Sequence, residues 1–100
     1  MGPRVEIRFC PACRWHTRAG WLAQELFTTF GNALGEVALV SPAPGTFDVL
    51  VDGVRVFSRS EARRFPEPRD LKIALRDRCF PDHALGHSEP VRAADAEDDT

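Results

Sequence analysis

A change of hydrophobic period near the start of the chain restricts its fold more than any other feature. Residues 4–9, RVEIRF, alternate apolar with charged side chains, a period of two that predicts a half-buried strand. Beyond Cys10 the apolar residues recur at spacings of three and four, which predicts an amphipathic helix of about 20 residues. A strand that passes directly into a long helix is typical of α/β proteins, because such a helix covers one face of a sheet.

Both ends of this helix carry recognisable signals. We expect Cys10 at the N-cap and Pro11 at the first helical position, where the N–H that proline lacks would be unpaired in any case. Gly31 and Gly35 are expected to end the helix, since glycine readily adopts the left-handed conformation that closes the last turn. The motif C-P-A-C is therefore placed at the junction of strand and helix.

The middle of the chain predicts three further strands. Residues 36–40 form a short apolar run that ends at a proline-rich loop. Residues 46–51 and 54–59 are predicted to pair as a hairpin, because Asp52-Gly53 between them is favoured in a two-residue type I′ turn. The hairpin extends, in antiparallel sense, a sheet whose first two strands are parallel and joined by the long helix.

A second helix is expected to follow a polar loop at residues 60–69. Asp70 is predicted to cap it, and the helix closes near Phe80 with Leu71, Leu75 and Cys79 on its inner face. The order is β-α-β-β-β-α, so the sequence predicts one α/β domain with a four-stranded mixed sheet and two helices.

Charge divides the chain into a nearly neutral domain and an acidic tail. The whole chain has 13 lysines and arginines against 15 aspartates and glutamates, and residues 86–100 alone hold five of the acidic residues. We therefore predict a folded domain over residues 1–87 and a disordered acidic tail over residues 88–100, which has too few apolar residues to pack. The charge pattern disfavours nucleic-acid binding, and the chain shows neither a signal peptide nor a membrane span, so a cytoplasmic location is expected.

The two cysteines of the C-P-A-C motif are the candidate reactive groups. On a first helical turn the sulfurs of Cys10 and Cys13 would lie on one side, within reach of a reversible disulfide. The positive end of the helix dipole would favour thiolate over thiol, as thiol–disulfide exchange requires. The third cysteine, Cys79, is predicted to be a buried structural thiol.

A zinc site is the main competing interpretation. Cys10, Cys13, Cys79 and His83 supply three thiolates and one imidazole at local spacings that zinc ligands tolerate. The two pairs are far apart in sequence, and the domain has enough core to fold without metal, so we assign no metal ligands.

Aromatic and histidine residues beside the motif admit two readings. Trp15 is predicted to pack in the core, with a substrate groove beside the dithiol as the alternative. Trp21 lies off the main apolar stripe and is expected to be partly exposed, as at a partner surface. His16 is expected on a solvated helix face, although it lies near enough to the thiols to assist proton transfer.

The chain also resembles a known family. The run VEIRFCPACRWHTRAGWLAQELFTTFGNALGEVALVSPAPGTFDVLVDG, followed by VFSR, FPEPRDLK, RDRCFP and LGHS, is similar to the SelT/SelW/SelH (Rdx) family, especially its bacterial selenoprotein W-like members. The likeness extends from Val5 to Ser88. It implies a thioredoxin-like fold with a redox-active dithiol, and it implies that animal members carry selenocysteine at the position of Cys13.

The resemblance leaves two assignments open. Thioredoxin logic makes Cys10 the exposed attacking thiolate and Cys13 the resolving thiol, which we prefer, whereas the selenocysteine position favours Cys13. Thioredoxins also place a cis-proline opposite the dithiol, for which Pro42 and Pro44 are candidates, and Thr46 then becomes a candidate substrate-facing residue.

We therefore predict a thiol–disulfide redox protein without an organic cofactor. Its expected partners are protein disulfides, with glutathione implied by the resemblance alone, and its expected role is in cell redox homeostasis. The alternative from another class is an interaction module whose partner affinity depends on the oxidation state of the dithiol.

Overall fold

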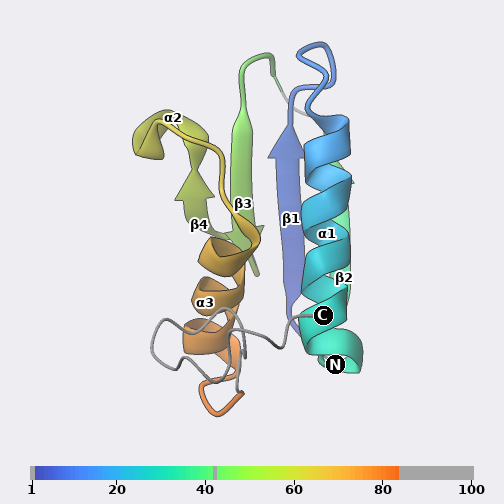
Figure 1. The fold of residues 1–100 in the computed structure, drawn as a ribbon, viewed down its shortest axis with the longest axis vertical. Helices are drawn as coiled ribbons and strands as arrows, with labels where there is room; N and C mark the ends of the chain where they lie inside the picture. Colours follow the sequence, from blue (N-terminus) through green and yellow to red (C-terminus); the bar gives the residue numbers. More distant parts are fainter. Residues whose placement is uncertain (1, 42, 84–100) are drawn as a thin grey trace, which may run out of the picture.

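The computed structural model describes residues 2–41 and 43–83 (Figure 1). The elements are β1 (Arg4–Phe9), α1 (His16–Phe30), the 3₁₀ helix η1 (Gly31–Ala33), β2 (Glu36–Val40), β3 (Phe47–Val51), β4 (Val54–Ser58), α2 (Arg59–Ala62) and α3 (Pro68–Cys79). The predicted order of strands and long helices is confirmed. The short helix α2 is an addition, since it occupies part of the segment predicted as a polar loop.

The strands form one mixed sheet in the order β2-β1-β3-β4. Strand β1 pairs with β2 in parallel and with β3 in antiparallel sense, and β3 pairs with β4 in antiparallel sense. The predicted hairpin is present, and its turn residues Asp52 (φ 48°) and Gly53 (φ 84°) both have the positive φ that a type I′ turn requires. The Asp52 backbone N–H also donates to the Arg4 carbonyl oxygen at 2.8 Å, which ties the turn to β1.

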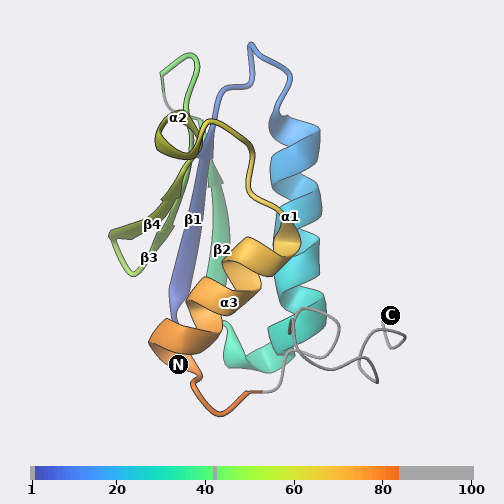
Figure 2. The ribbon, with the colours of Figure 1, turned by 60° about the vertical axis from the view of Figure 1, so that its left-hand side comes forward.

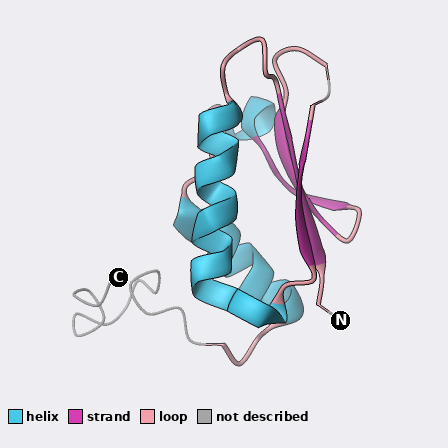
Figure 3. Ribbon diagram, turned by 90° about the vertical axis from the view of Figure 1, so that its right-hand side faces the viewer, coloured by secondary structure: helices cyan, strands magenta, loops and turns pink. Residues whose placement is uncertain are grey.

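Helices α1 and α3 lie on the same face of the sheet, so the molecule has two layers (Figures 2 and 3). The other face carries charged side chains of β1 and β2, in which Glu6 pairs with Arg4 and Arg8, and Arg4 also pairs with Glu36. This division follows from the period of β1, since alternate side chains point to opposite faces of a sheet.

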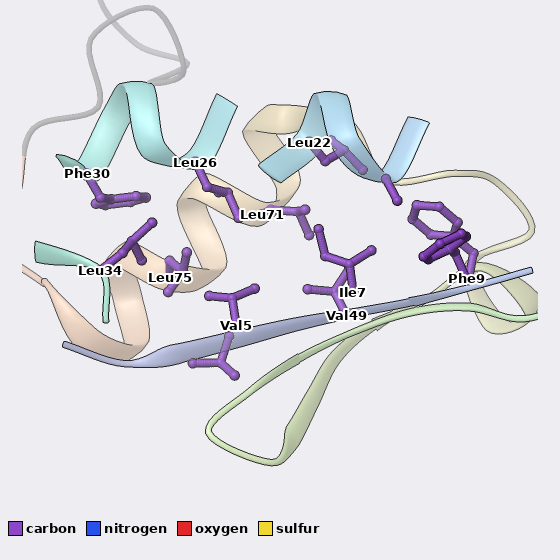
Figure 4. Packing of buried hydrophobic residues seen from close by; sticks show 13 residues of the cluster. Val5, Ile7, Phe9, Leu22, Leu26, Phe30, Leu34, Val49, Leu71 and Leu75 are labelled. Atoms are coloured by element: carbon purple, nitrogen blue, oxygen red, sulfur yellow. The ribbon is translucent and has the colours of Figure 1, made fainter. Parts of the chain in front are cut away.

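The hydrophobic core fills the space between the sheet and the two long helices (Figure 4). Its buried members come from every layer: Val5, Ile7, Phe9, Ala19, Leu22, Leu26, Phe30, Leu34, Phe47, Val49, Val51, Leu71 and Leu75. Each large aliphatic side chain buried in this way contributes about 1.5–3 kcal/mol of transfer free energy. The helix α1 therefore owes its stability mainly to packing of its apolar face.

Glycines close α1 and turn the chain into β2. Gly31 is the C-cap residue with φ 53°, and its N–H donates to the Phe27 carbonyl, which confirms its predicted role. Gly35 acts differently, because a Cβ built on it would lie 2.4 Å from the carbonyl oxygen of Gly2. The chain approaches its own first residues here, and the Gly35 N–H donates to the Pro3 carbonyl at 2.9 Å.

Helix α3 begins earlier than predicted. Its N-cap is Glu67 and Pro68 is its first residue, so the prediction of Asp70 as N-cap is wrong. Asp70 instead occupies the third helical position of a capping box, where its carboxylate accepts a hydrogen bond from the Glu67 N–H at 2.7 Å. The same carboxylate pairs with Arg64, and this pairing holds the pKa of Asp70 below its usual range.

The predicted domain boundary between residues 87 and 88, and the acidic tail beyond it, lie outside the described residues. Within the described ranges no helix is both long enough and apolar enough to cross a membrane.

Candidate redox site

The C-P-A-C motif forms a tight turn between β1 and α1. The Cys13 N–H donates to the Cys10 carbonyl oxygen at 3.2 Å, and the Arg14 N–H donates to the Pro11 carbonyl oxygen at 2.9 Å. Cys10 and Cys13 form a disulfide, with their Cα atoms 5.3 Å apart. The predicted proximity of the two sulfurs is therefore confirmed.

The prediction that Cys10 caps the helix is wrong. Helix α1 begins at His16, and its N-cap is Trp15. A continuous helix would need the Arg14 N–H to donate to the Cys10 carbonyl, but Arg14 has φ 65° and bonds to Pro11 instead. The motif thus lies in a turn before the helix, and the dipole argument for a Cys10 thiolate at the N-cap no longer applies.

The two cysteines differ in exposure, in the sense opposite to our prediction. Cys10 is buried, with 1% of its surface exposed, whereas Cys13 is half-buried. The Cys13 N–H also donates to the Cys10 Sγ at 3.2 Å. Cys13 is consequently the more accessible sulfur, and Cys10 is the sulfur that receives a backbone hydrogen bond.

Thr46 lies next to the motif through the register of the sheet. Phe9 pairs with Phe47, so the antiparallel register places the half-buried Thr46 beside Cys10 at the end of β1. Figure 1 shows the β2–β3 loop at the same end of the molecule as the β1–α1 turn. The described residues contain no cis peptide bond, so Pro44 is not the cis-proline we considered, and Pro42 lies outside the described residues.

An aromatic cluster packs against the turn. The rings of Trp15 and Phe65 meet edge to face with centroids 5.0 Å apart, and Phe47 lies 6.2 Å from Trp15 and 5.4 Å from Phe65. Trp15 is only partly buried, so it packs against the core as predicted and also faces the surface. Contacts of this edge-to-face kind contribute about 0.5–1.5 kcal/mol beyond burial.

Two arginines stack on this cluster. The Arg59 guanidinium lies 4.8 Å from the Trp15 ring and 4.7 Å from the Phe65 ring, and Arg18 lies 4.1 Å from the Phe65 ring. The Nε atom of Arg59 is buried without a hydrogen-bond partner. Sequence reasoning missed Arg18, Arg59 and Phe65, because no linear pattern relates α2 and the α2–α3 connection to the start of α1.

A cavity of about 390 Å³ opens beside the turn. Its lining residues are Arg14, Trp15, Thr17, Arg18, Trp21 and Phe65. Trp21 is 46% exposed, which confirms the predicted partial exposure. His16 is exposed as predicted, and it is not among the lining residues.

The remaining cysteine lies elsewhere. Cys79 is a free, half-buried thiol at the end of α3, and it lines a cavity of about 570 Å³ together with Pro3 and Asp52. Because Pro3 precedes β1 and Cys10 follows it, Cys79 lies at the opposite end of β1 from the disulfide. Burial raises the pKa of the Cys79 thiol, and the Asp52 carboxylate raises this pKa further.

This separation contradicts the zinc alternative. Cys79 and the nearby His83, which packs on the Phe30 ring at 4.9 Å, cannot converge with Cys10 and Cys13. Within the described residues no group of three or more histidine, cysteine, aspartate or glutamate side chains is arranged to hold a metal ion.

Comparison with known proteins identifies the family. The family model described as Rdx family matches residues 4–77. A crystal structure of a Bordetella parapertussis protein is similar at 44% identity and a TM-score of 0.75, covering 78% of this chain and 99% of that one. The selenoprotein W-related protein from Vibrio cholerae is similar at 36% identity and a TM-score of 0.74, covering 77% and 96%. No curated protein matches the chain.

These matches agree with the motifs noted in the sequence. The mixed sheet with its helices on one face is a thioredoxin-like fold, and the Cys10–Cys13 pair at its β1–α1 turn fits a redox role. The chain belongs to the Rdx family.

Proposed function

We propose that this protein is a thiol–disulfide oxidoreductase that reduces protein disulfides through Cys10 and Cys13. The observation that carries the proposal is the pairing of these two sulfurs in a turn at the sheet end, beside an open cavity. A dithiol that closes its own disulfide can donate two electrons and two protons to a substrate disulfide without backbone rearrangement.

The exposure of the two sulfurs favours Cys13 as the attacking thiol, in place of our initial preference for Cys10. An attacking thiolate must reach a sulfur of another protein, and Cys13 is the more exposed of the pair. The hydrogen bond from the Cys13 N–H to the Cys10 Sγ would stabilise Cys10 as a thiolate, both when it resolves the mixed disulfide and when it leaves during re-reduction.

The reaction then has two exchange steps. The Cys13 thiolate forms a bond to one sulfur of the substrate disulfide, the substrate S–S bond breaks, and the other substrate sulfur leaves as a thiolate that takes a proton from water. The Cys10 thiolate next attacks the Cys13 Sγ, which releases the second substrate sulfur and forms the Cys10–Cys13 disulfide. The substrate gains two electrons and two protons overall, and the dithiol is oxidised.

The surroundings of the dithiol supply the substrate contacts in this proposal. Trp15 forms a wall of the cavity, and Thr46 follows the register of β3 to a position beside Cys10, so both are proposed as substrate-facing residues. A thiol reductant must return the protein to its dithiol form, and glutathione is the reductant we propose on the basis of family membership. These steps need no organic cofactor, and we place the protein in cytoplasmic redox homeostasis.

Trapping of mixed disulfides tests both the function and the order of attack. Cys10→Ser retains the attacking thiol and lacks the resolving one, so it should accumulate mixed disulfides with a disulfide-bonded protein such as insulin. Cys13→Ser should accumulate far less, and Cys79→Ser should behave as the parent. Mixed disulfides formed mainly by Cys13→Ser would restore Cys10 as the attacking thiol.

Turnover separates the reductase from an interaction module. The parent protein, supplied with a dithiol reductant, should reduce insulin over many cycles. A protein that changes its affinity for a partner on oxidation, but reduces insulin no faster than the reductant alone, would contradict the proposed function.

A further inference from the structure

The cavity beside the C-P-A-C turn is positively charged. Two of its lining residues, Arg14 and Arg18, are exposed cations, and none of its lining residues is acidic. Arg59 is not a lining residue, but it adds a third positive charge next to two lining rings, since its guanidinium stacks on Trp15 and Phe65. Three cations therefore surround the aromatic walls of one small hollow.

Among the described residues these three cations have no carboxylate partner, unlike several other arginines of the surface. Arg4, Arg8, Arg55 and Arg64 each pair with a carboxylate. Within the part of the chain that the structure describes, no carboxylate forms an ion pair with Arg14, Arg18 or Arg59. The described carboxylates thus leave the positive potential beside the cavity uncompensated, and this potential favours an anionic occupant.

The position of the cavity ties this potential to the reacting sulfur. Arg14 and Trp15 directly follow Cys13, so a substrate disulfide at Cys13 brings its neighbouring residues over the cavity. An arginine guanidinium binds a carboxylate through paired hydrogen bonds, and the partly exposed rings of Trp15 and Trp21 offer apolar contact to the stem of an acidic side chain.

The extent of the cavity favours a polypeptide segment over a small thiol. From Thr17 to Trp21 the lining follows about one turn of α1, roughly 6 Å at 1.5 Å per residue, and Arg14 and Trp15 extend it beyond the start of the helix. The indole of Trp21 at the far end is nearly half exposed and would be covered by residues that continue beyond the reacting cysteine. An extended segment advances about 3.3 Å per residue, so three or four residues reach this indole.

We propose, as a refinement that rests on the proposed function, that this cavity selects protein disulfides whose cysteine is followed or preceded by acidic residues. Arg14 and Arg18 bind the carboxylates in this arrangement, and Trp15 and Trp21 contact the segment that carries them. The substrate class is an acidic disulfide-bonded peptide, recognised before Cys13 attacks.

Matched peptides test this selectivity. Each peptide carries one cysteine in a mixed disulfide with a chromogenic thiol, flanked by glutamate, glutamine or lysine, and the rate constant is measured with the reduced protein. We expect the glutamate peptide to react about tenfold faster than the glutamine peptide at low salt, and the lysine peptide to react slowest. The preference should shrink as NaCl rises from about 0.01 M to about 1 M.

Variants assign the preference to the cavity. Arg14→Gln and Arg18→Gln should each reduce the glutamate-to-glutamine rate ratio, measured within the same variant, by about threefold. Arg18→Lys keeps the charge and should retain most of the ratio. Arg78→Gln removes the same charge from an exposed residue near the end of α3, and it should leave the ratio unchanged.

The outcomes distinguish failure of the acidic-peptide preference from failure of the proposed reductase function. Equal rates for all three peptides would overturn the acidic preference and leave the reductase intact, whereas no reaction with any peptide would contradict the function itself. An Arg78→Gln effect as large as that of Arg18→Gln would assign the preference to net charge and overturn the site. The site would also be overturned if the Arg14 and Arg18 variants lost their reaction with oxidised glutathione but reacted with the glutamate peptide at the parent rate.

Discussion

The three thiols of this protein lie in two contrasting environments at opposite ends of β1. At one end, Cys10 and Cys13 share a turn in which a backbone N–H faces one sulfur and arginines line the adjoining cavity. At the other end, Cys79 and Asp52 line a second cavity, and burial and the Asp52 carboxylate raise the pKa of the Cys79 thiol. Residue type alone therefore says little about thiol chemistry, because the surroundings decide whether a thiolate is stabilised.

Serine replacements should separate the two environments most strongly. Cys10→Ser and Cys13→Ser should each lower multiple-turnover insulin reduction by roughly a thousandfold or more, because a single thiol cannot close the intramolecular disulfide. Cys79→Ser should stay within about twofold of the parent. Loss of turnover in Cys79→Ser, with folding intact by circular dichroism, would show that the contrast between the two ends is wrong.

A cavity made in the core near Cys79 should affect stability without affecting the dithiol. Leu75 is 1% exposed and lies one turn before Cys79, so Leu75→Ala should lower the free energy of unfolding by about 2–5 kcal/mol in urea titrations. Leu39→Ala is the matched control, since Leu39 is 47% exposed and its replacement should have a much smaller effect. The reduction rate per folded molecule should be unchanged in both, and a parallel fall in that rate would imply coupling between the two ends.

Removal of the Asp70 carboxylate should have a moderate and pH-dependent effect on the segment that carries Phe65. Asp70→Asn weakens the capping box and the pairing with Arg64, and should lower stability by about 1 kcal/mol at neutral pH. Because the folded-state pKa of Asp70 is lowered, its contribution is present above the unfolded-state pKa and is lost as pH falls through the folded-state pKa. Parent and variant should therefore converge in acid, and a constant difference at every pH would exclude a role for the charge.

The smallest expected effect concerns the reactivity of Cys79. Its raised pKa means that alkylation by iodoacetamide should follow a pH profile displaced to higher pH than that of the unfolded chain. The sign for stability follows, since the unfolded chain loses the proton first and folding is weakened as pH rises above the unfolded-state pKa. Mass spectrometry of Cys10→Ser/Cys13→Ser, in which Cys79 is the remaining thiol, measures this profile. A profile displaced to lower pH would contradict the assigned environment.

The sequence predicted most of the fold because the relevant signals are local. The alternation in β1, the apolar stripe of α1 and the Asp52-Gly53 turn each depend on residues close in the chain, and all three are confirmed. The start of α1 was predicted five residues too early, since Pro11 suits a helical first turn equally well in sequence. The structure instead gives Arg14 a left-handed conformation, and Trp15 packs against Phe65.

Only the part of the candidate site that depends on residues close in the chain was predicted. The pairing of Cys10 with Cys13 follows from their spacing and is present, but the burial of Cys10 follows from packing at the sheet end and was predicted wrongly. The cavity could not be predicted, because Phe65 reaches Trp15 across 50 residues of chain.

By itself the sequence determined the order of strands and helices, the dithiol at the β1–α1 junction and the family, all of which are written in short-range patterns. Only the tertiary structure decided which sulfur is accessible, where Cys79 lies and which cations gather beside the disulfide. The physical reason is that hydrophobic period and turn chemistry act between near neighbours, whereas burial and electrostatic environment depend on which distant segments pack together.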